Sequence, residues 1–334
     1  MKENDLMSVD SYKKHLPAGF GMKKGAQKFP LMILPSVSNV CNSRCVHCWY
    51  TRKPGLRKRD AVTFMPEGLL KKIIEEVAGH TDPRPLIRVT GTGEPFLMPE
   101  LTECLVYGCG EKDVRMAVIS NGSLITPERS SRLIDAGIEA LEISADAADQ
   151  ETYERIRPGL EFKDLMHNIE HMLDYRSKTG AKTKILVSAV DSKEIDASEV
   201  DLFWRDKVDN VIIRKYLTYG QLSEEGYSRD TYLPPEERVP CPYPFERMVV
   251  LADGNVTFCN FDVEDSCFMG NINDQTIEEI WRNDKFEAWR RLVLDGRFEQ
   301  VPLCAKCNDW KYKSWNYNFF SVLDKAKNRI ATTN

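Results

Sequence analysis

Three cysteines lie close together in the stretch VCNSRCVHCWYT, which covers residues 40–51. Three residues separate Cys41 from Cys45, and two separate Cys45 from Cys48. A structural zinc site normally uses four protein ligands, so three thiols leave such a site incomplete unless His47 completes it in a cramped position. A [4Fe–4S] cluster has four irons, and three cysteines would leave one iron open to a ligand that is not protein.

A second group of cysteines lies in the last third of the chain. Cys241, Cys259, Cys304 and Cys307 supply four thiols, which is enough for a closed metal site holding either zinc or an iron–sulfur cluster. Cys267 lies between the second and third of these residues. Its possible roles are a core thiol, a substitute ligand or a donor of a hydrogen atom to a substrate radical.

Short apolar segments rich in β-branched residues alternate with helical patterns along the first two thirds of the chain. The predicted strands are residues 31–37, 86–90, 114–120, 138–144, 184–190 and 210–215. Such alternation predicts parallel βα units with right-handed connections. Six units suit this length better than an eight-unit barrel, which typically needs about 250 residues. We therefore expect an α/β fold whose main part is a partial (β/α)6, TIM-like barrel.

The alternation stops near residue 219. Residues 219–240 are rich in glycine, proline and charge, as in a linker. The following segment MVVLADGNVTFC predicts a hairpin that turns at Asp253-Gly254, and residues 277–294 predict a helix with a candidate break near Asn283. The predicted organisation is an N-terminal extension (1–30), a barrel (31–218), a linker (219–240) and a small α+β domain (241–334).

The candidate motifs share one kind of position. The three-cysteine loop follows the first predicted strand, Thr90–Pro95 follows the second, Ser120–Ser123 the third and Ser144–Asp146 the fourth. Barrels of this kind hold their active sites at the carboxyl ends of the strands. The four motifs are therefore expected to outline one pocket.

The spacing Cys41-x3-Cys45-x2-Cys48 resembles the signature of the radical S-adenosylmethionine (radical SAM) enzymes. The resemblance implies that these cysteines hold a [4Fe–4S] cluster whose open iron binds S-adenosylmethionine (SAM). SAM is then cleaved to a 5′-deoxyadenosyl radical that removes a hydrogen atom from the substrate. The cofactors supply this chemistry, and the protein supplies orientation and excludes side reactions.

The resemblance also implies contacts to SAM. Thr92-Gly93-Glu94-Pro95 is similar to the family's GGEP segment, with Thr92 in place of the first glycine. Its backbone carbonyls and Glu94 would receive the methionyl ammonium group, and Gly93 would permit the close approach that this contact needs. The other implied contacts are Ser120 and Asn121 for the ribose, Ser144 as a further SAM-contacting serine, Arg157 for the methionyl carboxylate, and His47 or Trp49 near the adenine or the cluster. Arg157 could equally be a surface residue.

The second cysteine group resembles the shortened SPASM domain, or twitch domain, of radical SAM enzymes. The carriers of this resemblance are Gly254-x4-Cys259 and Cys304-x2-Cys307. It implies a hairpin and a helix around one auxiliary [4Fe–4S] cluster ligated by all four cysteines, so two such clusters are expected in total. Structural zinc is the alternative for this site.

Twitch enzymes similar to this chain include dehydrogenases of aminocyclitols and aminosugars. The resemblance implies an oxidoreductase that converts a sugar-like or aminocyclitol alcohol to a ketone, with the auxiliary cluster accepting the second electron. A flavodoxin- or ferredoxin-type protein would supply the first electron. The alternatives are a redox-neutral epimerase that uses Cys267, a maturase of ribosomal peptides, and a non-enzymatic iron–sulfur or zinc protein. Arg214, Tyr216 and Tyr219 are candidate substrate contacts by position alone.

Composition narrows the class of protein. The chain has 46 basic and 51 acidic residues, and this negative balance disfavours a general nucleic-acid binder. The basic stretch at residues 52–59 is expected to be a solvated loop. Its N-terminus lacks the features of a secretory signal, and its apolar runs are too short to span a membrane. Ten cysteines without such a signal favour metal or redox chemistry, so we expect a cytoplasmic protein.

Overall fold

The computed structural model describes residues 28–52, 64–81, 84–217, 238, 240–262, 267–312 and 319–326. The predicted N-terminal extension and linker lie almost wholly outside these residues, as do Tyr219 and most of the basic stretch. The domain boundaries derived from the sequence therefore stay predictions.

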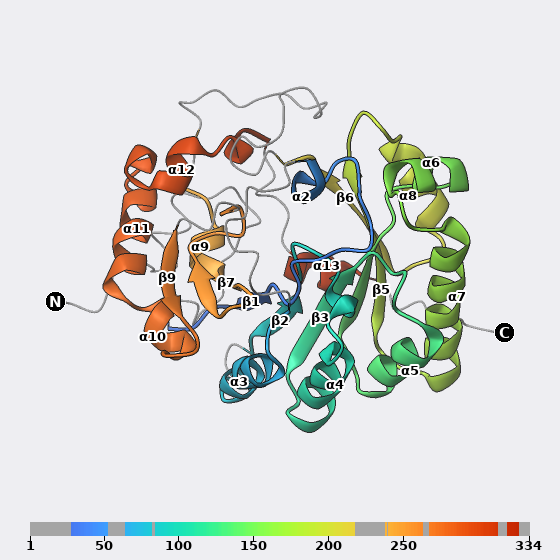
Figure 1. The fold of residues 1–334 in the computed structure, drawn as a ribbon, viewed down its shortest axis with the longest axis horizontal. Coiled ribbons are helices and arrows are strands. Elements are labelled where there is room, and N and C mark those ends of the chain that lie inside the picture. Colours follow the sequence, from blue (N-terminus) through green and yellow to red (C-terminus); the bar gives the residue numbers. More distant parts are fainter. Residues whose placement is uncertain are drawn as a thin grey trace.

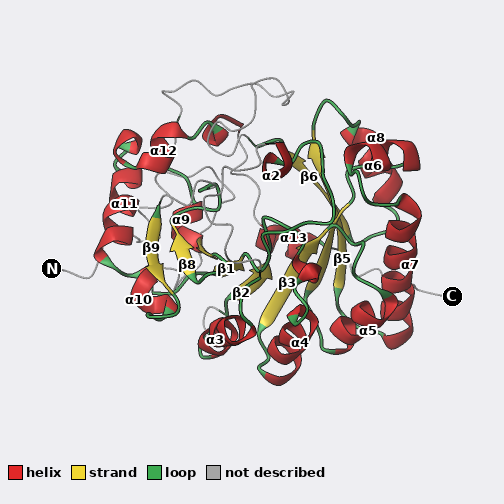
Figure 2. Ribbon diagram, in the orientation of Figure 1, coloured by secondary structure: helices red, strands yellow, loops and turns green. Residues whose placement is uncertain are grey.

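The described strands form one sheet of nine, in the order β6-β5-β4-β3-β2-β1-β7-β8-β9 (Figures 1 and 2). The first six strands pair in parallel and confirm the predicted α/β partial barrel. They are β1 (Met32–Pro35), β2 (Leu86–Val89), β3 (Arg115–Ser120), β4 (Ala140–Ser144), β5 (Lys184–Asp191) and β6 (Asn210–Lys215). Each lies within two residues of its predicted bounds.

Helices cover the outer face of this sheet (Figure 2). They are α3 (Glu67–Ala78), α4 (Leu101–Val106), α5 (Pro127–Asp135), α6 (Gln150–Ile156), α7 (Phe162–Thr179) and α8 (Ala197–Trp204). The short helix α2 (Trp49–Arg52) instead directly follows the three-cysteine loop at the carboxyl end of the strands (Figure 2). In α3, apolar residues recur at helical spacing from Leu69 to Val77, and that face is buried against the sheet. The Thr126 hydroxyl caps α5 by accepting a hydrogen bond from the Arg129 backbone N–H.

The C-terminal hairpin continues the barrel sheet. Strand β7 (Arg247–Val250) pairs in parallel with β1, and then antiparallel with β8 (Asn255–Thr257), which is followed by β9 (Phe268–Asn271). The turn between β7 and β8 contains Gly254, whose φ of +87° favours glycine. The predicted hairpin is thus confirmed. Its direct pairing with β1 was not predicted.

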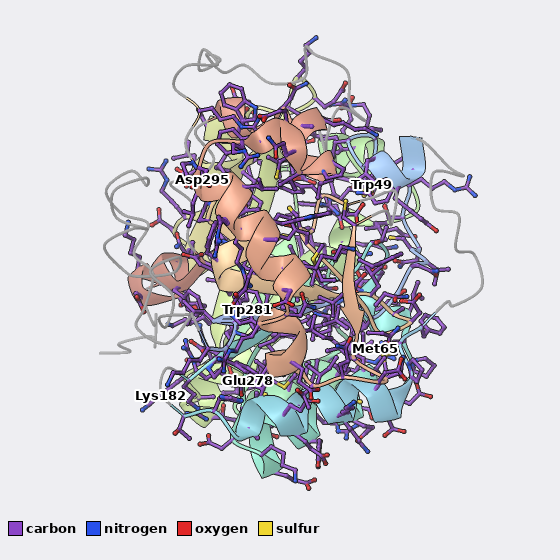
Figure 3. All side chains as sticks on the ribbon, turned by 90° about the vertical axis from the view of Figure 1, so that its left-hand side faces the viewer. Trp49, Met65, Lys182, Glu278, Trp281 and Asp295 are labelled. Atoms are coloured by element: carbon purple, nitrogen blue, oxygen red, sulfur yellow. The ribbon has the colours of Figure 1, made fainter. Side chains whose placement is uncertain are left out.

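The remaining helices are α9 (Tyr243–Glu246), α10 (Ile277–Trp281), α11 (Asp284–Leu294), α12 (Pro302–Lys306) and α13 (Phe319–Lys325). The predicted break lies between α10 and α11, where the Asn283 side chain caps α11. In the side view of Figure 3, α10, which ends at the labelled Trp281, and α11, which ends just before the labelled Asp295, cross the near face of the molecule. None of the helices in the described part of the chain is long and apolar enough to cross a membrane.

Helix α13 closes the amino end of the barrel. Lys184 and Asn210, the first residues of β5 and β6, donate hydrogen bonds to carbonyls of α13. The rings of Phe319 and Phe320 face Arg88 of β2 and Arg115, the first residue of β3. The opposite, carboxyl end of the strands is left for the site.

Candidate functional site

A cavity of about 820 Å³ lies at the carboxyl ends of the barrel strands. This volume falls within the usual range for small-molecule sites. Every residue predicted to bind the first cluster or SAM lines this cavity: Cys41, Cys45, His47, Cys48, Trp49, Thr92, Gly93, Glu94, Ser120, Asn121, Ser144 and Arg157. The structure therefore brings the four sequence motifs together, as the βα register requires.

Within the three-cysteine loop, Ser43 contacts two of the thiols. Its backbone N–H donates to Cys41 Sγ over 3.4 Å, and its hydroxyl lies 3.2 Å from Cys45 Sγ. Burial raises the pKa of the Cys41 thiol to about 11, and it also raises that of Cys48. Thiolates at this position would need a bound metal to be stable, and the Ser43 donors would then face the ligating sulfurs.

The segment Arg157–Gly159 supports this loop from behind. The Pro158 carbonyl accepts hydrogen bonds from the Arg44 backbone and the Ser43 hydroxyl. Gly159 has a φ of +96°, and a side chain there would lie 2.9 Å from the Asn42 carbonyl oxygen. The geometry of the three-cysteine loop thus depends on a segment that follows β4 and α6 in the chain.

Gly93 makes a close contact between the second motif and the cysteine loop. A Cβ at this position would lie 1.8 Å from the Val40 carbonyl oxygen, and the Glu94 backbone N–H donates to that same oxygen over 2.8 Å. We expected glycine here so that a ligand could approach. The structure shows that glycine is required because two backbones touch.

The Glu94 carboxylate is buried and already has protein partners. It accepts hydrogen bonds from the Ser120 hydroxyl at 2.7 Å, the Asn121 backbone at 2.8 Å and the Phe96 backbone at 3.1 Å. Burial raises the pKa of Glu94, and these donors oppose the shift. The side chain therefore joins the second and third motifs, and any role in receiving an ammonium group is added to this structural one.

The Asn121 side chain is held by the cysteine loop. Its amide donates to the Asn42 side-chain oxygen over 2.8 Å, while its own oxygen accepts from the Ser123 backbone and hydroxyl. Asn42 was not predicted as a site residue, although its place inside the cysteine motif was a usable signal.

Asp146, Arg157 and His47 form a buried polar group beside Cys45. Arg157 pairs with the Asp146 carboxylate, and its Nη1 donates to Cys45 Sγ over 3.6 Å. Burial alone would raise the pKa of Asp146, but Arg157 and His47 lower it below its ordinary value. His47 Nε2 lies 3.4 Å from Asp146 Oδ2, and burial lowers the pKa of the imidazole. His47 thus faces Asp146 rather than completing a zinc site with the cysteines.

The second cysteine group lines a smaller pocket of its own. Its members Cys241, Cys259, Cys304 and Cys307 lie among aromatic and aliphatic side chains. Burial raises the pKa of each thiol, to about 12 at Cys304 and about 11 at Cys307. Neighbouring cysteines add to the shift at Cys241, Cys259 and Cys304, and Asp309 adds to it at Cys307. Cys259 lines the large cavity as well. One continuous space therefore extends from the first cysteine group to the second.

Arg238 is the charged residue among the described side chains of this smaller pocket. Its guanidinium lies 4.0 Å from the Phe298 ring centre and 5.1 Å from that of Trp310, and donates to the Cys304 carbonyl over 2.9 Å. Four thiols that line one pocket beside one cation are a donor set that suits an anionic thiolate-ligated cluster. Both cysteine groups thus supply the donor types that the predicted cofactors need, although no group of three or more His, Cys, Asp and Glu side chains among the described residues is already arranged to hold a metal ion.

The candidate substrate contacts lie in different surroundings. Arg214 lines the large cavity, whereas Tyr216 is buried and donates its hydroxyl to the His47 carbonyl over 3.3 Å. Cys267 is 1% exposed and is not among the described residues that line either cavity. Arg88 also lines the cavity and was missed, although a charge inside an apolar strand was a signal.

Two family models match the chain. The model of the radical SAM superfamily matches residues 36–190, and the SPASM model, described as an iron–sulfur cluster-binding domain, matches residues 241–308. The chain belongs to the radical SAM superfamily. It is an enzyme of this superfamily with a C-terminal SPASM-type domain, and the two domains imply SAM and iron–sulfur clusters as cofactors.

Individual proteins similar to this radical SAM enzyme differ in what they bind. An S-adenosyl-L-methionine-dependent 2-deoxy-scyllo-inosamine dehydrogenase from Niallia circulans is 25% identical over 83% of this chain and 92% of its own length. The structure of BtrN with AdoMet and 2-DOIA has a TM-score of 0.58 at 21% identity, covering 89% of this chain and 99% of that one. SuiB of Streptococcus suis, bound to the precursor peptide SuiA, has a TM-score of 0.63 at 15% identity, covering 79% and 67%.

Proposed function

We propose that this radical SAM enzyme is a dehydrogenase that oxidises a hydroxyl group of a sugar-like or aminocyclitol substrate to a ketone. One observation carries the proposal. The same cavity is lined by Cys41, Cys45 and Cys48 at the barrel and by Cys259 of the second cysteine group. A substrate in this cavity would lie between two redox centres, which a two-electron oxidation can use and a redox-neutral reaction does not need.

The proposed cofactors are two [4Fe–4S] clusters, one on the three-cysteine loop and one on the four cysteines of the SPASM-type domain. When bound, they and SAM would supply hydrogen-atom abstraction by a 5′-deoxyadenosyl radical and a nearby acceptor for one further electron. The substrate would lose one hydrogen atom, one proton and one electron, which together make the two-electron oxidation. A flavodoxin- or ferredoxin-type donor would supply the electron consumed in cleaving SAM.

The chain's own part is to orient the reactants. His47, Trp49, Thr92, Gly93, Ser120, Asn121, Ser144 and Arg157 are the proposed SAM contacts, since they line the cavity beside the cysteine loop. Glu94 fixes Ser120 and Asn121 in place. Fixed, buried polar side chains lose little freedom when a ligand binds, and this favours a defined reactive geometry.

The test uses protein reconstituted with iron and sulfide without oxygen. It is incubated with SAM, a reductant, and a panel of cyclitols, aminocyclitols and sugars. We expect about eight irons per chain, 5′-deoxyadenosine, and a ketone that borodeuteride traps with one deuterium. Cys259→Ala should keep 5′-deoxyadenosine formation and lose most of the ketone. Formation of 5′-deoxyadenosine with no oxidised product from any alcohol would refute the proposal.

Two alternatives are less well supported. An epimerase needs a hydrogen-atom donor at the substrate, but Cys267 belongs to the hydrophobic core and its backbone N–H is held by Asp262. Deuterium incorporated from solvent at a substrate carbon, and lost in Cys267→Ala, would revive it. Peptide maturation is supported only by the fold that the chain shares with peptide-bound structures such as those of SuiB and anSMEcpe. A non-enzymatic iron–sulfur or zinc protein does not agree with membership of this enzyme superfamily.

A further inference from the structure

Tyr153 has a buried hydroxyl group that no other described residue contacts by a hydrogen bond. The residue lies in α6 and is 0% exposed, and its ring packs against that of Phe162 with 5.5 Å between the ring centres. Buried tyrosine hydroxyls usually have a hydrogen-bond partner, and burying one without a partner costs free energy. The position of this hydroxyl therefore needs a physical reason.

The end of α6 holds the three-cysteine loop on either side of Cys45. The Ile156 carbonyl accepts a hydrogen bond from the Val46 backbone N–H over 3.0 Å. The Pro158 carbonyl accepts one from the Arg44 backbone N–H, also over 3.0 Å. The backbone directly before and directly after Cys45 is thus fixed to the last turn of α6 and the segment that follows it.

Tyr153 lies one helical turn before this contact and close to the same cysteine. The Arg157 backbone N–H donates to the Tyr153 carbonyl over 2.8 Å, and the Arg157 side chain donates to Cys45 Sγ over 3.6 Å. Burial raises the pKa of the Tyr153 hydroxyl, and the positive charge of Arg157 opposes this shift. Negative charge on Cys45, Asp146 or Glu94 adds to it. The hydroxyl is therefore near enough to these groups for their charges to act on it.

The two carboxylates near this hydroxyl have other partners. Asp146 pairs with Arg157, and Glu94 accepts hydrogen bonds from a serine hydroxyl and from backbone N–H groups. Neither set of contacts includes Tyr153. Cys45 differs from both carboxylates, because its thiol becomes a thiolate when it ligates a metal, and a thiolate is the better hydrogen-bond acceptor.

Donors already surround the sulfur atoms of the three-cysteine loop. Ser43 places its backbone N–H 3.4 Å from Cys41 Sγ and its hydroxyl 3.2 Å from Cys45 Sγ. Arg157 adds a charged donor to Cys45. Hydrogen bonds to the sulfurs of an iron–sulfur cluster are one of the factors that set its reduction potential. Tyr153 supplies one more donor near the same cysteine.

We propose that the Tyr153 hydroxyl donates a hydrogen bond to the sulfurs of the first cluster at Cys45 and thereby raises the reduction potential of this cluster. Tyr153 is then a positioning residue that acts through the cluster. Binding of the cluster would offset the cost of burying the hydroxyl without a partner. This inference rests on the proposed first cluster, but it requires neither the dehydrogenase reaction nor a particular substrate.

A redox titration of the reconstituted full-length protein tests the inference. The reduced clusters are followed by electron paramagnetic resonance, and the signal that changes when SAM is added before freezing identifies the first cluster. In Tyr153→Phe the ratio of reduced to oxidised first cluster at a given potential should fall about tenfold, which equals a potential lower by about 59 mV for a one-electron couple. Tyr175→Phe is the matched control. It removes an exposed hydroxyl that donates to Asp135, and it should leave the potential unchanged.

Urea unfolding of the full chain without iron separates this role from structural support. Tyr153→Phe should be at least as stable as wild type there, because the deleted hydroxyl had no hydrogen bond to lose. Reconstitution should then raise the unfolding midpoint less in Tyr153→Phe than in wild type. A hydroxyl that bonds a buried water would instead give a less stable variant without iron and an unchanged potential. If the iron-free chain does not unfold cooperatively, the potential alone decides.

Three outcomes would overturn the inference: an unchanged or raised potential in Tyr153→Phe; an iron-free variant that is less stable than wild type or does not fold; or a wild-type protein without a signal that responds to SAM. Ketone formation is measured separately. A lowered potential in Tyr153→Phe without any ketone from wild type would contradict the dehydrogenase and leave the role of Tyr153 standing. A ketone from wild type with an unchanged potential in Tyr153→Phe would do the reverse.

Discussion

Arg157 donates a hydrogen bond to the Cys45 sulfur across 3.6 Å while pairing with the buried carboxylate of Asp146. The sequence resemblance implied a pairing of this arginine with the SAM carboxylate, and that pairing stays a prediction. In the structure it joins the end of β4 to the three-cysteine loop, and a charged donor now faces a proposed iron ligand. Charged donors to ligating sulfurs raise the potential of an iron–sulfur cluster.

Replacing Arg157 by Gln should destabilise the fold. It leaves Asp146 buried without its cation, and breaking a buried pair in this way typically costs about 3 kcal/mol or more. Arg155→Gln is the control two residues away, because its pair with Glu194 is about half exposed; its effect should stay below about 1 kcal/mol. Urea unfolding of both variants checks this, and equal losses would contradict the role given to Arg157.

Gly93→Ala should separate the second motif from the cysteine loop. The new methyl group would meet the Val40 carbonyl, so backbone has to move, at a cost of about 3 kcal/mol. Iron bound at the first site should fall with it. Gly68→Ala is the control, since α3 has open space at this position and alanine there should add about 0.5–1 kcal/mol of stability. Full iron content in Gly93→Ala would show that the contact is dispensable.

The acid stability of the protein should depend on Glu142, a buried carboxylate that pairs with Arg88 and Arg214. Burial alone would raise its pKa, but the two guanidinium groups hold it at about 2 in the folded chain against an ordinary 4.5, so its contribution is present above pH 4.5 and is lost as the pH falls towards 2. The difference in unfolding free energy between wild type and Glu142→Gln should shrink by about 3 kcal/mol across this window. Urea titrations between pH 6 and pH 2.5 measure it. Parallel curves for the two proteins would mean that the carboxylate is not ionised in the fold.

Arg238→Gln should lower the reduction potential of the second cluster. The guanidinium lies beside four thiol positions in an apolar pocket, where a positive charge stabilises the reduced, more negative cluster. A redox titration followed by electron paramagnetic resonance, in a background of Cys41→Ala, Cys45→Ala and Cys48→Ala, isolates this cluster. Arg297→Gln, which changes an exposed arginine in the same region, should leave the potential unchanged. An equal or raised potential in Arg238→Gln would contradict the prediction.

Local sequence patterns were sufficient to predict the barrel strands and to predict that the site residues lie around one cavity. β-Branched runs located the six barrel strands because five of them, β1–β5, are largely buried on both faces, and only the edge strand β6 is more exposed among the described strands of the barrel. The order of motifs after these strands placed the cysteine loop, Glu94, Asn121 and Ser144 around one cavity, since parallel strands share one carboxyl edge.

Contacts between side chains that lie far apart in the sequence could not be predicted from these local patterns. The pairing of Asn42 with Asn121, and of Arg88 with Glu142, depends on which side chains two segments distant in the sequence bring opposite each other. Gly93 illustrates the limit well. Its residue type was correctly taken as a sign of close approach, but the sequence could not tell a ligand from the Val40 backbone.

The parallel pairing of β1 with β7 has a mechanical consequence. The strand that leads into the three-cysteine loop and the strand that leads towards Cys259 share one ladder of hydrogen bonds, from Met32 opposite Arg247 to Pro35 opposite Val250. A hinge motion between the barrel and the C-terminal hairpin would have to break these hydrogen bonds. The distance between the two cysteine groups is therefore fixed when the chain folds, before any substrate binds.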